Sequence, residues 1–141
     1  MKKIFDKNYW KKAGGEILSF IVVVPCLFVL ILTMISVAKI GIEDQMLNFC
    51  TYNCCRAAVV STSLSTAQDR ANEIYAEQYG IDKATVAQEE LVSLEIIEGN
   101  SWEKGALLQC TITRDVDSLL AILSGNRTQT IIMMIENGGV I

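Results

Sequence analysis

Thiols are the side chains of this chain best suited to chemistry. Five cysteines are present, and three of them, Cys50, Cys54 and Cys55, lie close together. Because Cys50 and Cys54 are four residues apart, a helix would place them on one face as half of a thiolate metal site, with Cys55 pointing elsewhere. Cys110 would then be a third ligand, or a disulfide partner of Cys50 or Cys54. The alternative, which we adopt, is that these are small core side chains and that no metal is bound.

No other group of residues points to catalysis. The chain has no histidine, which removes the usual general base and the commonest metal ligand. It has no glycine-rich phosphate loop. Lys39, three residues after Ser36, is better explained as a lysine at the end of a membrane span than as the base of a serine–lysine pair. We therefore predict a protein that is not an enzyme, with no cofactor and no small-molecule substrate.

One apolar run dominates the N-terminal part of the sequence. Residues 17–38 (ILSFIVVVPCLFVLILTMISVA) contain no charge. About 20 apolar residues in a helix cross a hydrocarbon core of roughly 30 Å, so we predict a transmembrane helix over residues 16–40. The alternative is a signal peptide cleaved after Ser36-Val37-Ala38, which would leave a secreted domain beginning at Lys39. We prefer the span, because the apolar region of a signal peptide is only about 7–15 residues long.

The charges predict the orientation of this helix. Residues 1–15 carry a net charge of +4, and the rest of the chain carries −8. Positive charge gathers on the cytoplasmic side of membrane helices. We therefore expect residues 1–15 to be a basic cytoplasmic leader and the C-terminal domain to lie outside the cell membrane. An acidic exterior also argues against nucleic acid as a partner, because phosphate contacts need clustered lysine and arginine.

The helix is predicted to continue beyond the membrane. No proline occurs between Lys39 and Tyr79, and apolar or small residues recur at spacings of three and four, which indicates one helix face. These residues are Leu47, Cys50, Cys54, Ala57, Ser61, Leu64, Ala71, Ile74 and Tyr75. Gly80 is a natural C-cap. We predict one helix over about residues 13–79, with 41–80 as its extracytoplasmic part and 59–66 as its weakest stretch.

After Gly80 the pattern changes to that of a small β-rich domain, residues 81–141. Strands are predicted over residues 91–97, 106–113 and 127–136, separated by glycine-containing turns. In the second strand, Ala106, Leu108, Cys110 and Ile112 share one face. Three strands cannot bury themselves, so this face must pack on the outer half of the helix. The predicted fold is α+β, a long N-terminal helix against an antiparallel sheet of about three strands.

The start of the apolar run resembles the processing region of type IV prepilins. The segment KKAGGEILSFIVVVPCLFVL combines basic residues, a glycine and an apolar helix. It is most similar to TadE-like minor pilins and to pseudopilin-like proteins of Gram-positive Tad-type systems and conjugative elements. Their pattern resembles G-x-x-x-x-E-F with a proline further on. Phe20 matches the aromatic residue and Pro25 the proline, which places Gly14 before the cleavage point and Gly15 at the new N-terminus.

One position of the motif differs. Ser19 stands where the family has an acid that neutralises the free amine of a neighbouring subunit. The nearest acid is Glu16, which would be the second residue after cleavage.

The resemblance implies a structural subunit of a type IV or Tad-like pilus, secretion or conjugation apparatus. A prepilin peptidase would remove the leader. Like or related pilin subunits would pack through their N-terminal helices in the membrane, with Ser36, Ala38 and Gly41 allowing close approach. The alternative is an uncleaved single-pass membrane protein that binds a partner as an accessory subunit of an envelope complex.

Overall fold

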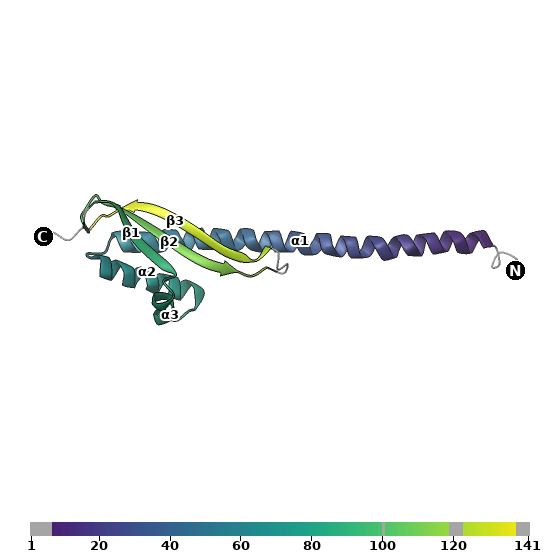
Figure 1. The fold of residues 1–141 in the computed structure, drawn as a ribbon, viewed down its shortest axis with the longest axis horizontal. Helices are drawn as coiled ribbons and strands as arrows, with labels where there is room; N and C mark the ends of the chain where they lie inside the picture. The colour runs from purple at the N-terminus through teal and green to yellow at the C-terminus, as the bar shows by residue number, and fades with distance from the viewer. Residues whose placement is uncertain (1–6, 100, 119–122, 138–141) are drawn as a thin grey trace.

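A computed structural model describes residues 7–99, 101–118 and 123–137, with side chains from Ser19 onward. Its elements are three helices followed by three strands. They are α1 (Lys7–Val59), α2 (Leu64–Tyr79), α3 (Lys83–Gln88), β1 (Val92–Glu98), β2 (Leu107–Val116) and β3 (Gly125–Met134). The N-terminal half of α1 projects alone from a two-layer domain, in which α1 and α2 lie under the sheet (Figure 1). The predicted α+β fold, a long helix packed on a three-stranded antiparallel sheet, is confirmed.

The predicted single helix to Tyr79 is wrong at one place. The chain leaves the helix after Val59 and resumes at Leu64, and α2 then folds back beside α1. The break falls within the β-branched and hydroxyl-rich stretch that we expected to be weakest. Ser63 begins α2 as its N-cap, and its Oγ accepts a hydrogen bond of 3.3 Å from the Thr66 amide. An N-cap serine starts a new helix, so the four linking residues form a hinge.

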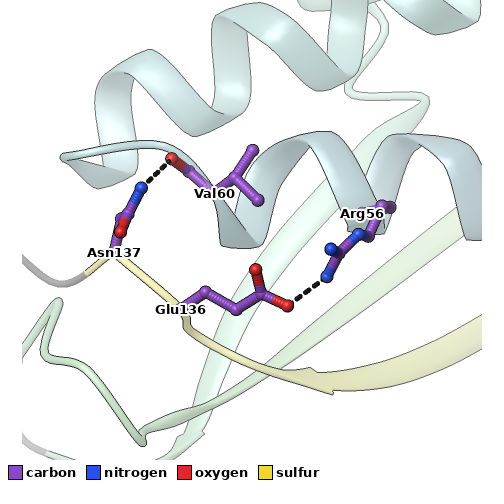
Figure 2. Close-up of polar contacts among 4 residues, drawn as sticks. All are labelled: Arg56, Val60, Glu136 and Asn137. Carbon is purple, nitrogen blue, oxygen red and sulfur yellow. Dashed lines mark hydrogen bonds and ion pairs between the residues drawn. The ribbon is translucent and has the colours of Figure 1, made fainter.

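The end of α1 is capped by groups from the C-terminal domain. The Val59 carbonyl accepts hydrogen bonds from the backbone amides of Glu136 (2.9 Å) and Asn137 (3.3 Å). The Asn137 side-chain amide donates to the Val60 carbonyl, and Arg56 pairs with the Glu136 carboxylate (Figure 2). Because the last carbonyls of a helix have no partner within it, these bonds stabilise the break. The residues after β3 thereby fasten the sheet to the hinge.

A tryptophan from the turn between β1 and β2 completes this cap. Trp102 Nε1 donates a hydrogen bond of 3.0 Å to the Ser61 carbonyl, and its half-buried ring packs against the core. The structure assigns it to packing, at the hinge.

The three strands form a meander in the order β1-β2-β3, with both pairs antiparallel. The central strand is longer than predicted, because the β2–β3 ladder continues to the pair Val116 and Gly125. In this register β3 runs from Gly125 to Met134, so it begins and ends two residues earlier than predicted. The predicted inner face of the central segment is confirmed, since its alternate residues are buried. These residues are Ala106, Leu108, Cys110 and Ile112.

The core lies between the helix pair and the sheet. α1 contacts α2 on one side and β2 and β3 on another, while α2 contacts β1. Leu47, with 1% of its surface exposed, and Tyr75 are its largest helical side chains. Alanines and cysteines fill much of the rest of the helix interface, where small side chains let two helices approach closely. Gly80, in the left-handed conformation with a φ of 64°, ends α2 as predicted.

Candidate assembly surface and thiol cluster

The N-terminal half of α1 has almost no partner within the chain. Between Ser19 and Ile35 nearly every described side chain is exposed, including Phe20 at 71%. Among the described residues, α1 is the helix that is long and apolar enough to cross a membrane. An apolar surface that surrounds a helix on all sides needs lipid or other helices to cover it.

The residues of the predicted processing motif all lie on α1. Gly14, Gly15 and Glu16 belong to the part of the helix whose side chains are outside the described set. Ser19 is exposed, and Pro25 lies inside the helix without ending it. These positions lie along one continuous helix.

Beyond the apolar run, an exposed stripe continues along α1. Ile42, Met46, Phe49 and Tyr52 recur at spacings of three and four, and each is exposed, Phe49 to 62%. We call these four residues the α1 stripe. Beside it lies a groove of about 310 Å³ between α1 and β3. Its lining residues are Gln45, Asn48, Phe49, Tyr52 and Ile131. The stripe extends the apolar surface from the projecting helix into the domain.

Sequence analysis missed this stripe. The same spacing signal was present, but it was assigned to another face of the helix, which begins at Leu47. One helix carries both apolar faces here, and periodicity alone does not tell which face the sheet covers. The expected role of Ser36 in helix packing is also corrected, because Ser36 is fully buried in this structure and its Oγ has no hydrogen-bond partner.

Charged residues join α1 to the near ends of β2 and β3. Lys39 Nζ donates a hydrogen bond of 2.7 Å to the Asp117 carbonyl. Glu43 lies 3.7 Å from Arg114, and Asp44 lies 3.9 Å from Arg127. Partly exposed ion pairs contribute little to stability individually. Together, these contacts determine the position along α1 at which the sheet packs. The sheet therefore begins where the apolar run ends.

Arg114 also contacts the end of α2. Its guanidinium lies 3.7 Å from the centroid of the Tyr79 ring, a favourable cation–π distance. The Tyr79 hydroxyl is buried and has no hydrogen-bond partner. Burial raises the pKa of Tyr79 to about 12, because the phenolate would lose its hydration.

Four of the five cysteines are fully buried in the core of the domain. Cys50 and Cys54 share a face as predicted, with their sulfur atoms 3.9 Å apart, and Cys54 Sγ donates to the Ala71 carbonyl of α2 at 3.4 Å. Cys55 points to a different face of α1, as predicted, but this face is also buried. It faces the sheet, where its thiol interacts with that of Cys110.

The reason is that α1 has two buried faces. One face meets α2 and the adjacent one meets the sheet, so consecutive residues Cys54 and Cys55 are both covered. The hydrogen bond with Cys50 and burial raise the pKa of the Cys54 thiol, which therefore stays protonated at neutral pH. Within the described residues, no group of three or more histidine, cysteine, aspartate or glutamate side chains is arranged to hold a metal ion.

Comparison of the chain with protein-family models, with curated proteins and with solved structures finds no match. The architecture itself is pilin-like, because a long N-terminal apolar helix is followed by a small antiparallel sheet that covers only its outer half.

Proposed function

We propose that this chain is a structural, non-enzymatic subunit of a type IV or Tad-like pilus, secretion or conjugation apparatus. In this proposal a prepilin peptidase removes the leader, and the subunit assembles through α1 with like or related subunits. The observation that carries it is one helix with two exposed apolar surfaces, a projecting half without intramolecular cover and the α1 stripe beyond it. A second subunit in the same orientation would cover both surfaces at once.

The described contacts also bear on the signal-peptide alternative. α1 is unbroken through Ser36, Val37 and Ala38, and Ser36 is fully buried. Lys39, the first residue after that cleavage point, is tied to Asp117. Signal cleavage would remove Ser36 from its buried site. This supports a chain in which the apolar helix stays attached to the domain.

The mature N-terminus tests the processing step. The full-length chain with a C-terminal tag is isolated from its native host, and its N-terminal peptide is identified by mass spectrometry. We expect a chain that begins at Gly15, and we expect Gly14→Ala to abolish this species. Gly41→Ala is the matched control, because an added Cβ at Gly41 meets no atom within 4 Å, and it should be processed normally.

Other N-termini would contradict the proposal in different ways. An intact leader would favour the uncleaved single-pass membrane protein that binds a partner. A chain that begins at Lys39 would indicate a secreted domain released by signal peptidase.

Assembly is tested on the α1 stripe. Phe49→Lys places a charge in the stripe at an exposed position, so we expect the domain to fold while chemical cross-linking of neighbouring subunits in intact cells decreases at least several-fold. Leu64→Lys is the control, because Leu64 is an exposed apolar residue on α2, outside the stripe. Equal cross-linking of both variants and the unmodified chain would show that the stripe is not an assembly surface.

A further inference from the structure

We infer that Cys55 and Cys110 form a disulfide that joins α1 to the central strand of the sheet. This pair differs from the pairings that sequence analysis considered, which joined Cys110 to Cys50 or Cys54. The inference goes beyond the proposed function and does not depend on pilus assembly. It requires only that the domain folds in an oxidising compartment, such as the outer side of a bacterial membrane, where disulfides persist.

Geometry places the two thiols side by side. Cys55 Sγ lies 3.8 Å from the Ile131 carbonyl oxygen on β3. Ile131 is the register partner of Cys110, and paired residues of antiparallel strands have Cα atoms only about 4.5–5.5 Å apart. Both side chains are completely buried at the interface between α1 and the sheet. Cys55 on α1 and Cys110 on the central strand therefore reach the same part of the core, which is the arrangement that a disulfide requires.

The two other buried thiols are engaged elsewhere. Cys54 Sγ donates to the Ala71 carbonyl on α2, and Cys50 Sγ lies against Cys54 Sγ. Both contacts lie on the face of α1 that meets α2. Cys50 and Cys54 are also one helical turn apart, so a bond between them would add no constraint between separate elements. Cys55 is thus the α1 cysteine that faces Cys110.

The oxidant is a protein disulfide, of the kind that a thiol–disulfide oxidoreductase carries. The thiolate of one cysteine attacks the oxidant's disulfide and displaces one of its sulfurs as a thiolate, which leaves a mixed disulfide. The second cysteine attacks this intermediate, forms the Cys55–Cys110 bond and releases the second sulfur. Two cysteine thiols lose two electrons and two protons, and the oxidant gains the electrons as a dithiol.

The folded state dictates when the reaction occurs. The hydrogen bond between the two thiols lowers the pKa of Cys55, and together with burial it raises the pKa of Cys110, so Cys55 is the thiol that supplies the attacking thiolate. Both side chains are completely buried once the domain has closed, so an oxidant does not reach them there. The bond therefore forms while the sheet docks on α1, before the pair is covered. Once it is buried, the same lack of access protects it from reductants.

The consequence is a covalent tie at the point where the domain holds its helix. The hydrogen bonds of the hinge fix the C-terminal end of α1 to the sheet, and the ion pairs of Glu43 and Asp44 fix the beginning of its packed half. The disulfide would lie between them, in the core. A force that pulls α1 along its axis would then be resisted by a covalent bond as well as by the noncovalent contacts between the helix and the sheet.

The test uses the full-length chain from its native host, unfolded in denaturant with an alkylating agent already present, because the thiols are buried in the folded domain. We expect three of the five cysteines to be alkylated, and all five only after reduction. Trypsin should release a peptide of residues 40–56 joined to one of residues 105–114. Fragmentation of this peptide in the mass spectrometer should assign the bond to Cys55.

Variants separate the candidate pairs. Cys55→Ala should eliminate the joined peptide, whereas Cys50→Ala, an equally buried control, should retain it. Five alkylated cysteines in the unmodified chain would overturn the inference, and so would a bond from Cys110 to Cys50 or Cys54. The same digest reports the mature N-terminus, so failure of this inference and failure of the proposed processing are read separately.

Discussion

The two halves of α1 have the same secondary structure and opposite surroundings. In the N-terminal half, the described side chains from Ser19 to Ile35 are almost all apolar and exposed, and no other element of the described chain touches most of them. In the C-terminal half, one broad arc is buried against α2 and the sheet, and the α1 stripe remains open. The first half of α1 is therefore not stabilised by packing within the described chain. Its cover must come from outside the chain, whereas the second half holds the domain together.

The largest expected difference in stability is between a leucine-to-alanine substitution in the C-terminal half of α1 and one in its N-terminal half. Leu47→Ala removes a fully buried side chain and leaves a cavity, so we expect the free energy of unfolding of the domain to fall by about 2–5 kcal/mol. Leu30→Ala, at a position that is 51% exposed, should change it by less than about 0.5 kcal/mol. Urea unfolding of the detergent-solubilised full chain measures both. Equal effects would contradict the comparison.

The hinge is what gives the second half of α1 a helical partner. Ser63→Ala removes the side chain that caps α2, and we expect a loss of about 1 kcal/mol. Ser65→Ala, at an exposed position within α2, is the matched control and should be neutral. The same unfolding measurement applies, with hydrogen exchange in α2 as a local readout. No difference between the variants would show that packing alone sets the break.

A smaller effect is expected at the outer end of α1. Arg56 and Glu136 pair across the hinge, but about half of each side chain is exposed (Figure 2). Solvent screens such pairs, so the coupling energy from Arg56→Ala, Glu136→Ala and the double variant should be smaller than the loss caused by Ser63→Ala. It should decrease in high salt. A coupling larger than the loss caused by Ser63→Ala would make this pair, rather than the backbone caps, the main anchor of β3.

At neutral pH the smallest change in the free energy of unfolding is expected for Tyr79→Phe. The difference between the two proteins should grow as the pH rises. The folded pKa is about 12, whereas an unfolded tyrosine titrates near pH 10. The unfolded state therefore loses its proton first, and the contribution of Tyr79 to stability falls between about pH 10 and 12. Tyr79→Phe keeps the ring under Arg114 and removes this loss. At pH 7 it should be neutral or stabilising, because the hydroxyl is buried without a partner.

The pH profile of the difference in stability between the two proteins is the measurement. A difference that stays constant from pH 8 to pH 12 would show that the Tyr79 hydroxyl is hydrated in the folded state.

Composition and periodicity alone determined the overall plan. An uncharged apolar run, a proline-free continuation and three alternating segments after Gly80 predict a long helix against a small sheet, because helix and strand periods are local properties of the chain. The buried face of β2 was predicted for the same reason. So was the glycine that ends α2, since few other residues adopt its backbone conformation.

Tertiary structure decided what each helix face meets. The break after Val59 depends on hydrogen bonds from Glu136, Asn137 and Trp102, which are distant in sequence. The position of Cys55 beside the sheet also follows from packing, because a helix that lies between α2 and a sheet buries two adjacent faces instead of one. The open α1 stripe is what remains. Local spacing gives two equivalent apolar faces, and only the packing of the rest of the chain chooses between them.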